Sequence, residues 1–161
     1  MSAFNQETRN EELERRAIEE VGNQRNVALI DELFSPNLVV HAMWHEPHMP
    51  QALEAMPEVE GMKAFLAQDH PDYENLHTSI DQMISGGDKV VVVTTTTGTR
   101  NGRQISWTSV GIDRFEGGRI AETWLLWDRL GMYQQLGVVP PTPELVKKAG
   151  LQLFKQADPD Q

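Results

Sequence analysis

The 161-residue sequence contains no cysteine. Disulfides, thiolate metal sites and cysteine nucleophiles are therefore excluded. Positive charge is also scarce, because 14 basic residues stand against 24 acidic ones and leave a formal net charge of −10. Nucleic acids and anionic membranes are recognised by clusters of Lys and Arg, so we expect neither as a partner.

Long apolar runs are missing as well. No apolar run is longer than four residues, the length of Val90–Val93, which is far shorter than a membrane span requires. The first 20 residues are polar and acidic, without the apolar core of a secretory signal. We therefore expect a cytoplasmic protein.

Apolar periodicity predicts helices over residues 7–34, with an interruption at Gly22-Asn23, and over Gly61–Asp69. A short strand is expected over Leu38–Ala42 and a closing helix over 129–136. Between them, four segments joined by short glycine-containing turns predict an antiparallel meander: roughly His77–Ile84, Lys89–Thr99, Arg103–Phe115 and Arg119–Asp128.

This order of elements predicts an α+β fold with helices on one face of a curved antiparallel sheet. We expect one domain over residues 1–140. The prolines at 140, 141 and 143 separate it from a C-terminal tail, 141–161, that contains a short amphipathic helix.

The last predicted strand carries apolar side chains on both faces. Alternation places Trp124, Leu126 and Asp128 on one face, and Thr123, Leu125 and Trp127 on the other. A sheet that is apolar on both sides needs a second covering layer, so we expect a homodimer.

Asp128 lies among the apolar residues Trp124, Leu126 and Trp127 in the sequence. Such surroundings disfavour the charged form and raise the pKa, which suits a general acid or base near neutral pH. The alternative is that Asp128 only caps the following helix. Its cross-strand neighbour is left open: a two-residue turn at Gly117-Gly118 predicts Trp107, and a three-residue turn with a bulge predicts Ser106 and brings Thr108 onto the same face.

Three histidines, His41, His45 and His48, lie close together in the chain with Glu46. Pro47 prevents the regular helical spacing of a metal site, so we expect no metal. His41 alone, at the end of a strand, is a candidate proton relay or hydrogen-bond donor; the alternative is a half-exposed loop histidine.

Arg114 and Asp113 could pair with Glu122 and Arg119 across the last hairpin. An Arg with two carboxylates could also activate water for epoxide opening. Strand alternation, however, points Arg114 and Asp113 to opposite faces unless a bulge intervenes.

The run Gly111–Trp124, followed by Asp128 and by Gly131-Met132-Tyr133-Gln134-Gln135-Leu136-Gly137, resembles the SnoaL-like polyketide cyclases, also called ester cyclases, of the nuclear transport factor two-like superfamily. Further matches occur in the expected order upstream, and the resemblance covers roughly residues 10–137. The matching upstream segments are Val40-His41, Gly61–Phe65, Gly87–Val90 and Gly98-Thr99.

The resemblance implies a conical α+β barrel with an apolar pocket between sheet and helices, usually dimeric. It implies cofactor-free aldol ring closure of polyketide esters, with Asp128 as the acid/base residue and His41 at a pocket position. The chain departs from the family pattern at Arg100, where histidine usually follows Gly-Thr, and in the loop 43–60.

We therefore expect a cofactor-independent cyclase or isomerase, with lyase-type carbon–carbon bond chemistry, that acts on a small hydrophobic carbonyl compound. Asp128 would remove a proton next to a carbonyl, and Asp128 or His41 would return one. The alternatives are an epoxide or lactone hydrolase and a non-catalytic, dimeric binding module. The candidate substrate-binding residues are Trp44, His45, Phe65, Trp107, Arg114 and Trp124.

Overall fold

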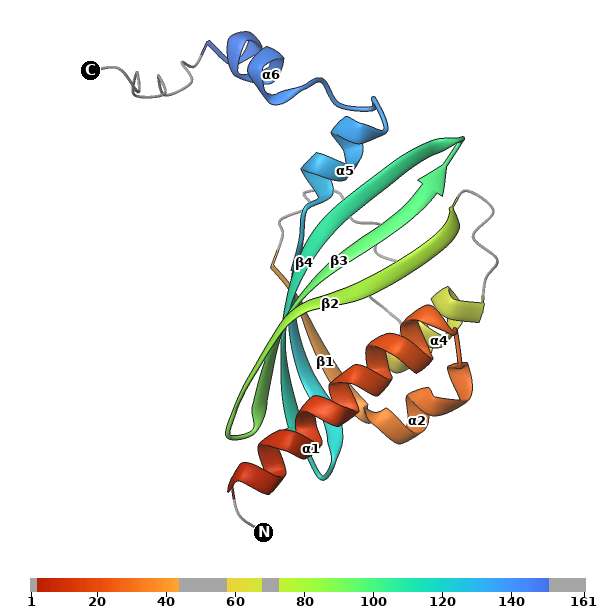
Figure 1. Ribbon diagram of the computed structural model, residues 1–161, viewed down its shortest axis with the longest axis vertical. Helices are drawn as coiled ribbons and strands as arrows, with labels where there is room; N and C mark the ends of the chain where they lie inside the picture. The colour runs from red at the N-terminus through yellow and green to blue at the C-terminus, as the bar shows by residue number, and fades with distance from the viewer. Residues whose placement is uncertain (1–2, 44–57, 68–72, 151–161) are drawn as a thin grey trace, which may run out of the picture.

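The computed structural model describes residues 3–43, 58–67 and 73–150 (Figure 1). These residues form an α+β fold, as predicted. The helices are α1 (Ala3–Arg16), α2 (Ile30–Leu33), α4 (Glu58–Ala67), α5 (Arg129–Gln135) and α6 (Thr142–Lys148), with a π-helical turn at Ala17–Asn23 and a 3-10 turn at Val27–Leu29 between α1 and α2. The strands are β1 (Phe34–Ala42), β2 (Glu74–Gly86), β3 (Lys89–Arg100), β4 (Arg103–Glu116) and β5 (Arg119–Trp127). None of the described helices is long and apolar enough to cross a membrane.

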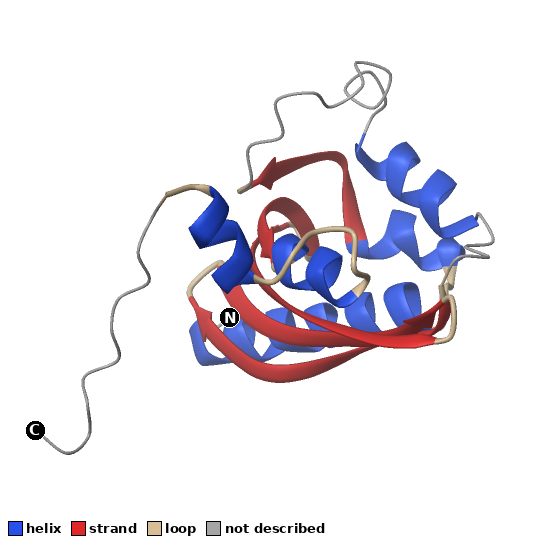
Figure 2. Cartoon of the chain, turned by 90° about the horizontal axis from the view of Figure 1, so that it is seen from above, coloured by secondary structure: helices blue, strands red, loops and turns tan. Residues whose placement is uncertain are grey.

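The five strands form one curved, open sheet in the order β1-β5-β4-β3-β2 (Figure 2). Strands β2 to β5 are the predicted antiparallel meander. β1, however, pairs in parallel with β5, with Val40 opposite Thr123, so the sheet is mixed rather than antiparallel throughout. Parallel pairing needs a long connection, and the whole β2–β4 meander lies between these two strands in sequence.

The sheet has two distinct faces. On the inner face, which α1, α2 and α4 cover, β3 buries every second residue from Val90 to Thr96. The outer face carries the residues in between. The most buried side chains of the inner core come from α2, β3 and β5, and each such aliphatic side chain stabilises the fold by about 1.5–3 kcal/mol. They are Ile30, Leu33, Val90 and Ile120.

β1 begins at Phe34, four residues before the predicted strand, because α2 ends at Leu33 and Phe34 already pairs with Ile120 of β5. Pro36 is tolerated inside β1 since this strand lies at the edge of the sheet, where one side needs no backbone donor. At the other end of the chain, α6 occupies the beginning of the predicted tail. Residues 151–161 of the tail lie outside the described residues.

The register of the last hairpin differs from both predicted alternatives. The turn has two residues, Gly117 and Gly118, but a bulge at Ala121 then shifts the pairing by one. Asp128 therefore lies opposite Thr108, whose carbonyl accepts a hydrogen bond from the Asp128 backbone N–H at 3.0 Å. A bulge at this position leaves no turn signal in the sequence, which explains why neither alternative included this register.

Candidate functional site

An apolar pocket of about 260 Å³ lies where α4, β2, β4, β5 and α5 meet. The described residues that line it carry aromatic and aliphatic side chains, so it suits a hydrophobic ligand. The only hydroxyl group among these side chains is the phenol of Tyr73. The lining residues are Phe65, Tyr73, Leu76, Trp107, Trp127 and Met132.

Two local features of the sheet shape this pocket. Gly98 on β3 leaves room for Leu76, because a Cβ at residue 98 would lie only 2.7 Å from the Leu76 Cδ2 atom. Trp107 and Trp127, from neighbouring strands, pack with ring centroids 5.8 Å apart and ring planes tilted by 50°. Tilted rings at this separation attract one another, which stabilises the aromatic wall. Met132 closes the pocket from α5 and is buried.

The hydroxyl group of Tyr73 is hydrogen bonded to a charged side chain. Arg100, at the end of β3, donates a hydrogen bond from Nη1 to the Tyr73 hydroxyl oxygen at 2.9 Å. Its guanidinium carbon also lies 4.8 Å from the centre of the Tyr73 ring. The permanently charged guanidinium of Arg100 therefore contacts both the hydroxyl oxygen and the ring of Tyr73.

Asp128 is the N-cap of α5. Its Oδ1 atom accepts a hydrogen bond from the Gly131 backbone N–H at 2.8 Å, and the residue is exposed. It lines an open hollow of about 350 Å³ together with Thr108, Val110 and Leu126. The carboxylate is thus not enclosed in the apolar pocket, although it directly follows Trp127. Its catalytic role stays a prediction.

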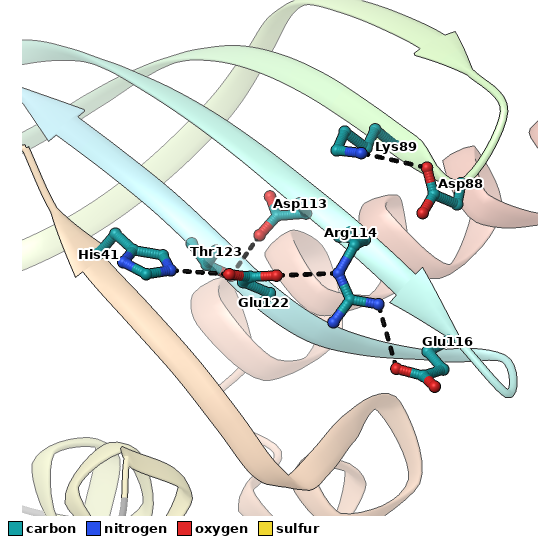
Figure 3. A network of polar contacts seen from close by, with 8 residues as sticks. All are labelled: His41, Asp88, Lys89, Asp113, Arg114, Glu116, Glu122 and Thr123. Atoms are coloured by element: carbon teal, nitrogen blue, oxygen red, sulfur yellow. Dashed lines mark hydrogen bonds and ion pairs between the residues drawn. The ribbon is translucent and has the colours of Figure 1, made fainter.

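His41 lies on the outer face of the sheet, within a polar cluster (Figure 3). Its Nε2 atom is 2.8 Å from Glu122 Oε1, and its ring stacks on Trp124 with centroids 4.9 Å apart. Arg114 donates from Nε to Glu122 Oε2 at 2.9 Å and from Nη1 to Glu116 at 3.1 Å. The hydrogen bond from His41, followed by that from Arg114, lowers the pKa of Glu122.

His41 and Asp128 do not meet. His41 pairs with Trp124, four residues before Asp128 along β5, a separation of about 13 Å at the rise of an extended strand. Arg114 forms the predicted cross-strand pair with Glu122 and does not line the apolar pocket. Both predicted roles, the relay and the substrate contact, are without support from this geometry and stay predictions.

Two of the other predicted substrate-binding residues, Phe65 and Trp107, line the apolar pocket. Trp124 faces the opposite side of the sheet and packs on His41. Trp44 and His45 lie outside the described residues. In the described part of the chain, no group of three or more His, Cys, Asp or Glu side chains is placed to hold a metal ion.

A buried pair of carboxyl groups, Glu14 of α1 and Asp113 of β4, was not predicted. Glu14 is 4% exposed and Asp113 is 6% exposed, and the two carboxyl groups lie close enough for each to affect the pKa of the other. Thr123 donates a hydrogen bond to Asp113 Oδ1 at 2.5 Å (Figure 3). Burial raises the pKa of Asp113 to about 6, and burial followed by the nearby Asp113 charge raises the pKa of Glu14 well above its usual value.

The geometry also separates the groups of the epoxide-opening hypothesis. Asp113 is buried beneath α1 on the inner face, whereas Arg114 and Glu122 lie on the outer face. Strand alternation predicted this separation, and the bulge at Ala121 does not bring Asp113 and Arg114 to one side.

A family model of the SnoaL-like polyketide cyclases matches residues 12–136 of this sequence. The chain belongs to this family. The resemblance inferred from the β4–α5 motif is thereby confirmed. No curated protein sequence matches the chain significantly.

Solved structures share the fold of this SnoaL-like chain. A candidate polyketide cyclase of Bacillus cereus is 25% identical, with 82% of this chain and 83% of the other covered and a TM-score of 0.69. IdmH of Streptomyces antibioticus, also a candidate polyketide cyclase, is 22% identical, with 80% of this chain and 98% of the other covered and a TM-score of 0.65. An LEH-like epoxide hydrolase of M. tuberculosis is 11% identical over 89% of this chain and 97% of the other, with a TM-score of 0.63, and shows the fold alone.

Within this SnoaL-like site, sequence reasoning missed Tyr73, Leu76, Trp127 and Met132 as lining residues. Alternation correctly places Trp127 on the face opposite Trp124. The sequence favours Trp124 as the substrate-binding residue because Trp124 shares a face with Asp128. The missing information was which face of β5 the helices cover. Arg100 gave a usable signal, since it occupies a position where the family usually has histidine.

Proposed function

We propose that this SnoaL-like protein is a cofactor-independent acid–base enzyme that cyclises or isomerises a hydrophobic carbonyl compound. The observation that carries the proposal is the apolar pocket between the inner face of the sheet, α4 and α5. A fused-ring or polyketide-type carbonyl compound matches both its apolar lining and its aromatic walls. Membership of the polyketide cyclase family supports the same substrate class.

In this proposal Asp128 carries the proton. Its carboxylate removes a proton from the carbon next to a carbonyl and leaves an enolate. The enolate carbon then attacks a second carbonyl of the same molecule, and the protonated Asp128 returns its proton to the new alkoxide. Reaching the substrate requires the carboxylate to leave Gly131, while the bond between the Asp128 backbone and Thr108 keeps its main chain in place.

The contacts of His41 narrow the hypothesis that either Asp128 or His41 returns the proton. Because His41 is engaged by Glu122 and stacked on Trp124 on the outer face, the proposal assigns proton return to Asp128 alone.

The test is deuterium uptake at the α-carbons of 2-tetralone, a two-ring ketone, in D₂O, followed by proton NMR. We expect the wild-type protein to accelerate the exchange. Asp128→Asn should lower the rate by about 10²–10⁴-fold, as expected for a lost general base. Asn keeps the capping oxygen, so the melting temperature should hardly change. Unchanged exchange in Asp128→Asn would rule out this role for Asp128.

The mass of the product separates the reaction classes once a turned-over substrate is known. Aldol closure and isomerisation leave the mass unchanged, whereas a hydrolase adds the elements of water. Oxygen from ¹⁸O-labelled water in a product of increased mass would contradict the cyclase proposal.

A second candidate, a non-catalytic binding module, is favoured by one observation: Asp128 is exposed and engaged as a helix cap. In that case the wild-type protein would bind 2-tetralone without accelerating its exchange. Asp128→Ala would bind the ketone equally well and lose only the stability of the cap.

A further inference from the structure

Tyr73 and Arg100 form a polar pair at the edge of an otherwise apolar pocket. Tyr73 directly precedes β2 and lines the pocket, and Arg100 stands at the end of the adjacent β3. The guanidinium donates to the phenol oxygen at 2.9 Å and also lies over the ring, 4.8 Å from its centre.

The direction of this hydrogen bond matters. A guanidinium only donates, so the Tyr73 oxygen is the acceptor in the bond to Arg100. The phenol proton is not used in that bond and is available for an acceptor inside the pocket. A donor to the phenol oxygen also makes the phenol a stronger donor, because hydrogen bonds in a chain polarise one another.

The surroundings define the ligand group that fits. A carbonyl oxygen offers only lone pairs, and it gains partial negative charge when the carbonyl compound becomes an enolate. A hydrogen bond donor in apolar surroundings stabilises such charge more strongly than water does. The positive charge of Arg100 also favours a ligand atom with partial negative charge, although the protein as a whole has a net charge of −10.

We propose that Tyr73 donates a hydrogen bond to the carbonyl oxygen of the substrate and that Arg100 positions and polarises Tyr73 for this contact. The inference rests on the proposed function, since it assumes a carbonyl compound in the apolar pocket. It adds an oxyanion-stabilising residue and a positioning residue to the proton carrier. Arg100, which stands where the family usually has histidine, thereby positions the residue that holds the substrate carbonyl.

The experiment compares two ligands of nearly equal shape. The ketone 2-acetylnaphthalene offers one carbonyl oxygen, and 2-isopropylnaphthalene replaces that oxygen with a methyl group. Their affinities are measured by calorimetry for the wild-type protein and for Tyr73→Phe. We expect Tyr73→Phe to lower the affinity for the ketone roughly tenfold, as one lost hydrogen bond would, and to leave the hydrocarbon affinity unchanged.

A spectroscopic measurement reports the contact directly. The infrared stretching frequency of the ketone, labelled with ¹³C at the carbonyl, should be lower when it is bound to the wild-type protein than when it is bound to Tyr73→Phe. The chain contains only two tyrosines, so Tyr133→Phe is a matched control that removes the other phenol. Tyr133 does not line the pocket, and the control should behave like the wild type in both measurements.

The role of Arg100 is tested by the ratio of the ketone affinity to the hydrocarbon affinity. Arg100→Gln should lower the ketone affinity but not the hydrocarbon affinity, and Arg100→Lys should restore part of the loss because it keeps the charge. A parallel loss for both ligands would mean that Arg100 only supports the pocket, and it would overturn the positioning role.

The possible failures are distinguishable. If both ligands bind but the ketone affinity and the carbonyl frequency are the same in Tyr73→Phe as in the wild type, the Tyr73 inference is overturned and the pocket stands. If neither ligand binds the wild-type protein, the apolar pocket is not a ligand site, and both the inference and the proposed function are overturned.

Discussion

The carboxylate of Asp128 occupies the space where Gly131 has no side chain. A Cβ on residue 131 would lie 2.1 Å from the Asp128 Oδ2 atom, well inside any tolerable contact. The same carboxylate accepts the Gly131 N–H at 2.8 Å, so glycine and aspartate together form the start of α5. This explains the Asp-x-x-Gly pattern of the sequence in local structural terms, whatever further role Asp128 has.

The first prediction concerns this cap. Gly131→Ala should displace the Asp128 carboxylate and lower the stability by about 1 kcal/mol or more, and Asp128→Ala should cost about 1 kcal/mol. Asp128→Asn should be close to the wild type, because its amide oxygen can accept the same bond. The measurement is urea unfolding of the three variants. Equal stability of Gly131→Ala and the wild type would contradict the described position of the carboxylate.

The second prediction concerns the pH dependence caused by Glu14 and Asp113. Burial raises both pKa values above those of the unfolded chain, so the folded state binds more protons than the unfolded state. Their contribution to stability is therefore fully present at acidic pH, below the unfolded pKa values. It is lost as the pH rises through the folded pKa values, of which that of Asp113 is about 6.

The variant that tests this is Glu14→Gln, which keeps the shape and removes one titrating group. Its amide can donate to Asp113, so we expect a flatter pH profile and a stability above that of the wild type at pH 8. The difference in slope should reach at most about 1.4 kcal/mol per pH unit for one proton. Urea unfolding from pH 5 to 8 measures it, with the exposed Glu12→Gln of the same helix as control. Identical profiles for wild type and Glu14→Gln would contradict the raised pKa of Glu14.

The fold was predictable from sequence because its determinants are local. Turn glycines and alternation define the meander, and the Asn101-Gly102 turn has the two positive φ angles, 50° and 72°, that its sequence predicts. The parallel pairing of β1 with β5 and the bulge at Ala121 depend on long-range packing, and no local pattern indicates them. The contact between Tyr73 and Arg100 could not be predicted for the same reason, because it depends on the pairing of β2 with β3 in this register.

The third prediction concerns Gly98 and Leu76. Because a Cβ on residue 98 would lie 2.7 Å from the Leu76 side chain and 3.3 Å from the Glu74 carbonyl oxygen, Gly98→Ala should overpack the pocket wall. The expected cost is about 1–3 kcal/mol. The double variant Gly98→Ala/Leu76→Ala should be less destabilised than the sum of its parts, since the smaller residue 76 makes room. Additive effects in urea unfolding would contradict the close approach of these two residues.

The fourth prediction uses two tryptophans on opposite faces of one strand. Trp127 lines the apolar pocket, whereas Trp124 stacks on His41 on the outer face. Trp127→Leu should weaken binding of 2-isopropylnaphthalene roughly tenfold or more, because it removes an aromatic wall of the site. Trp124→Leu, a change of the same size three residues away, should leave this affinity close to that of the wild type.

The outcome decides which face of the sheet holds the ligand. A loss confined to Trp127→Leu places the ligand on the inner face and supports Trp127 over Trp124 as the substrate-binding tryptophan. A loss confined to Trp124→Leu would move the site to the outer face, next to His41, and would contradict the pocket on which the proposed function rests. Melting temperatures of both variants serve as the control, because a general loss of folding would weaken binding in either case.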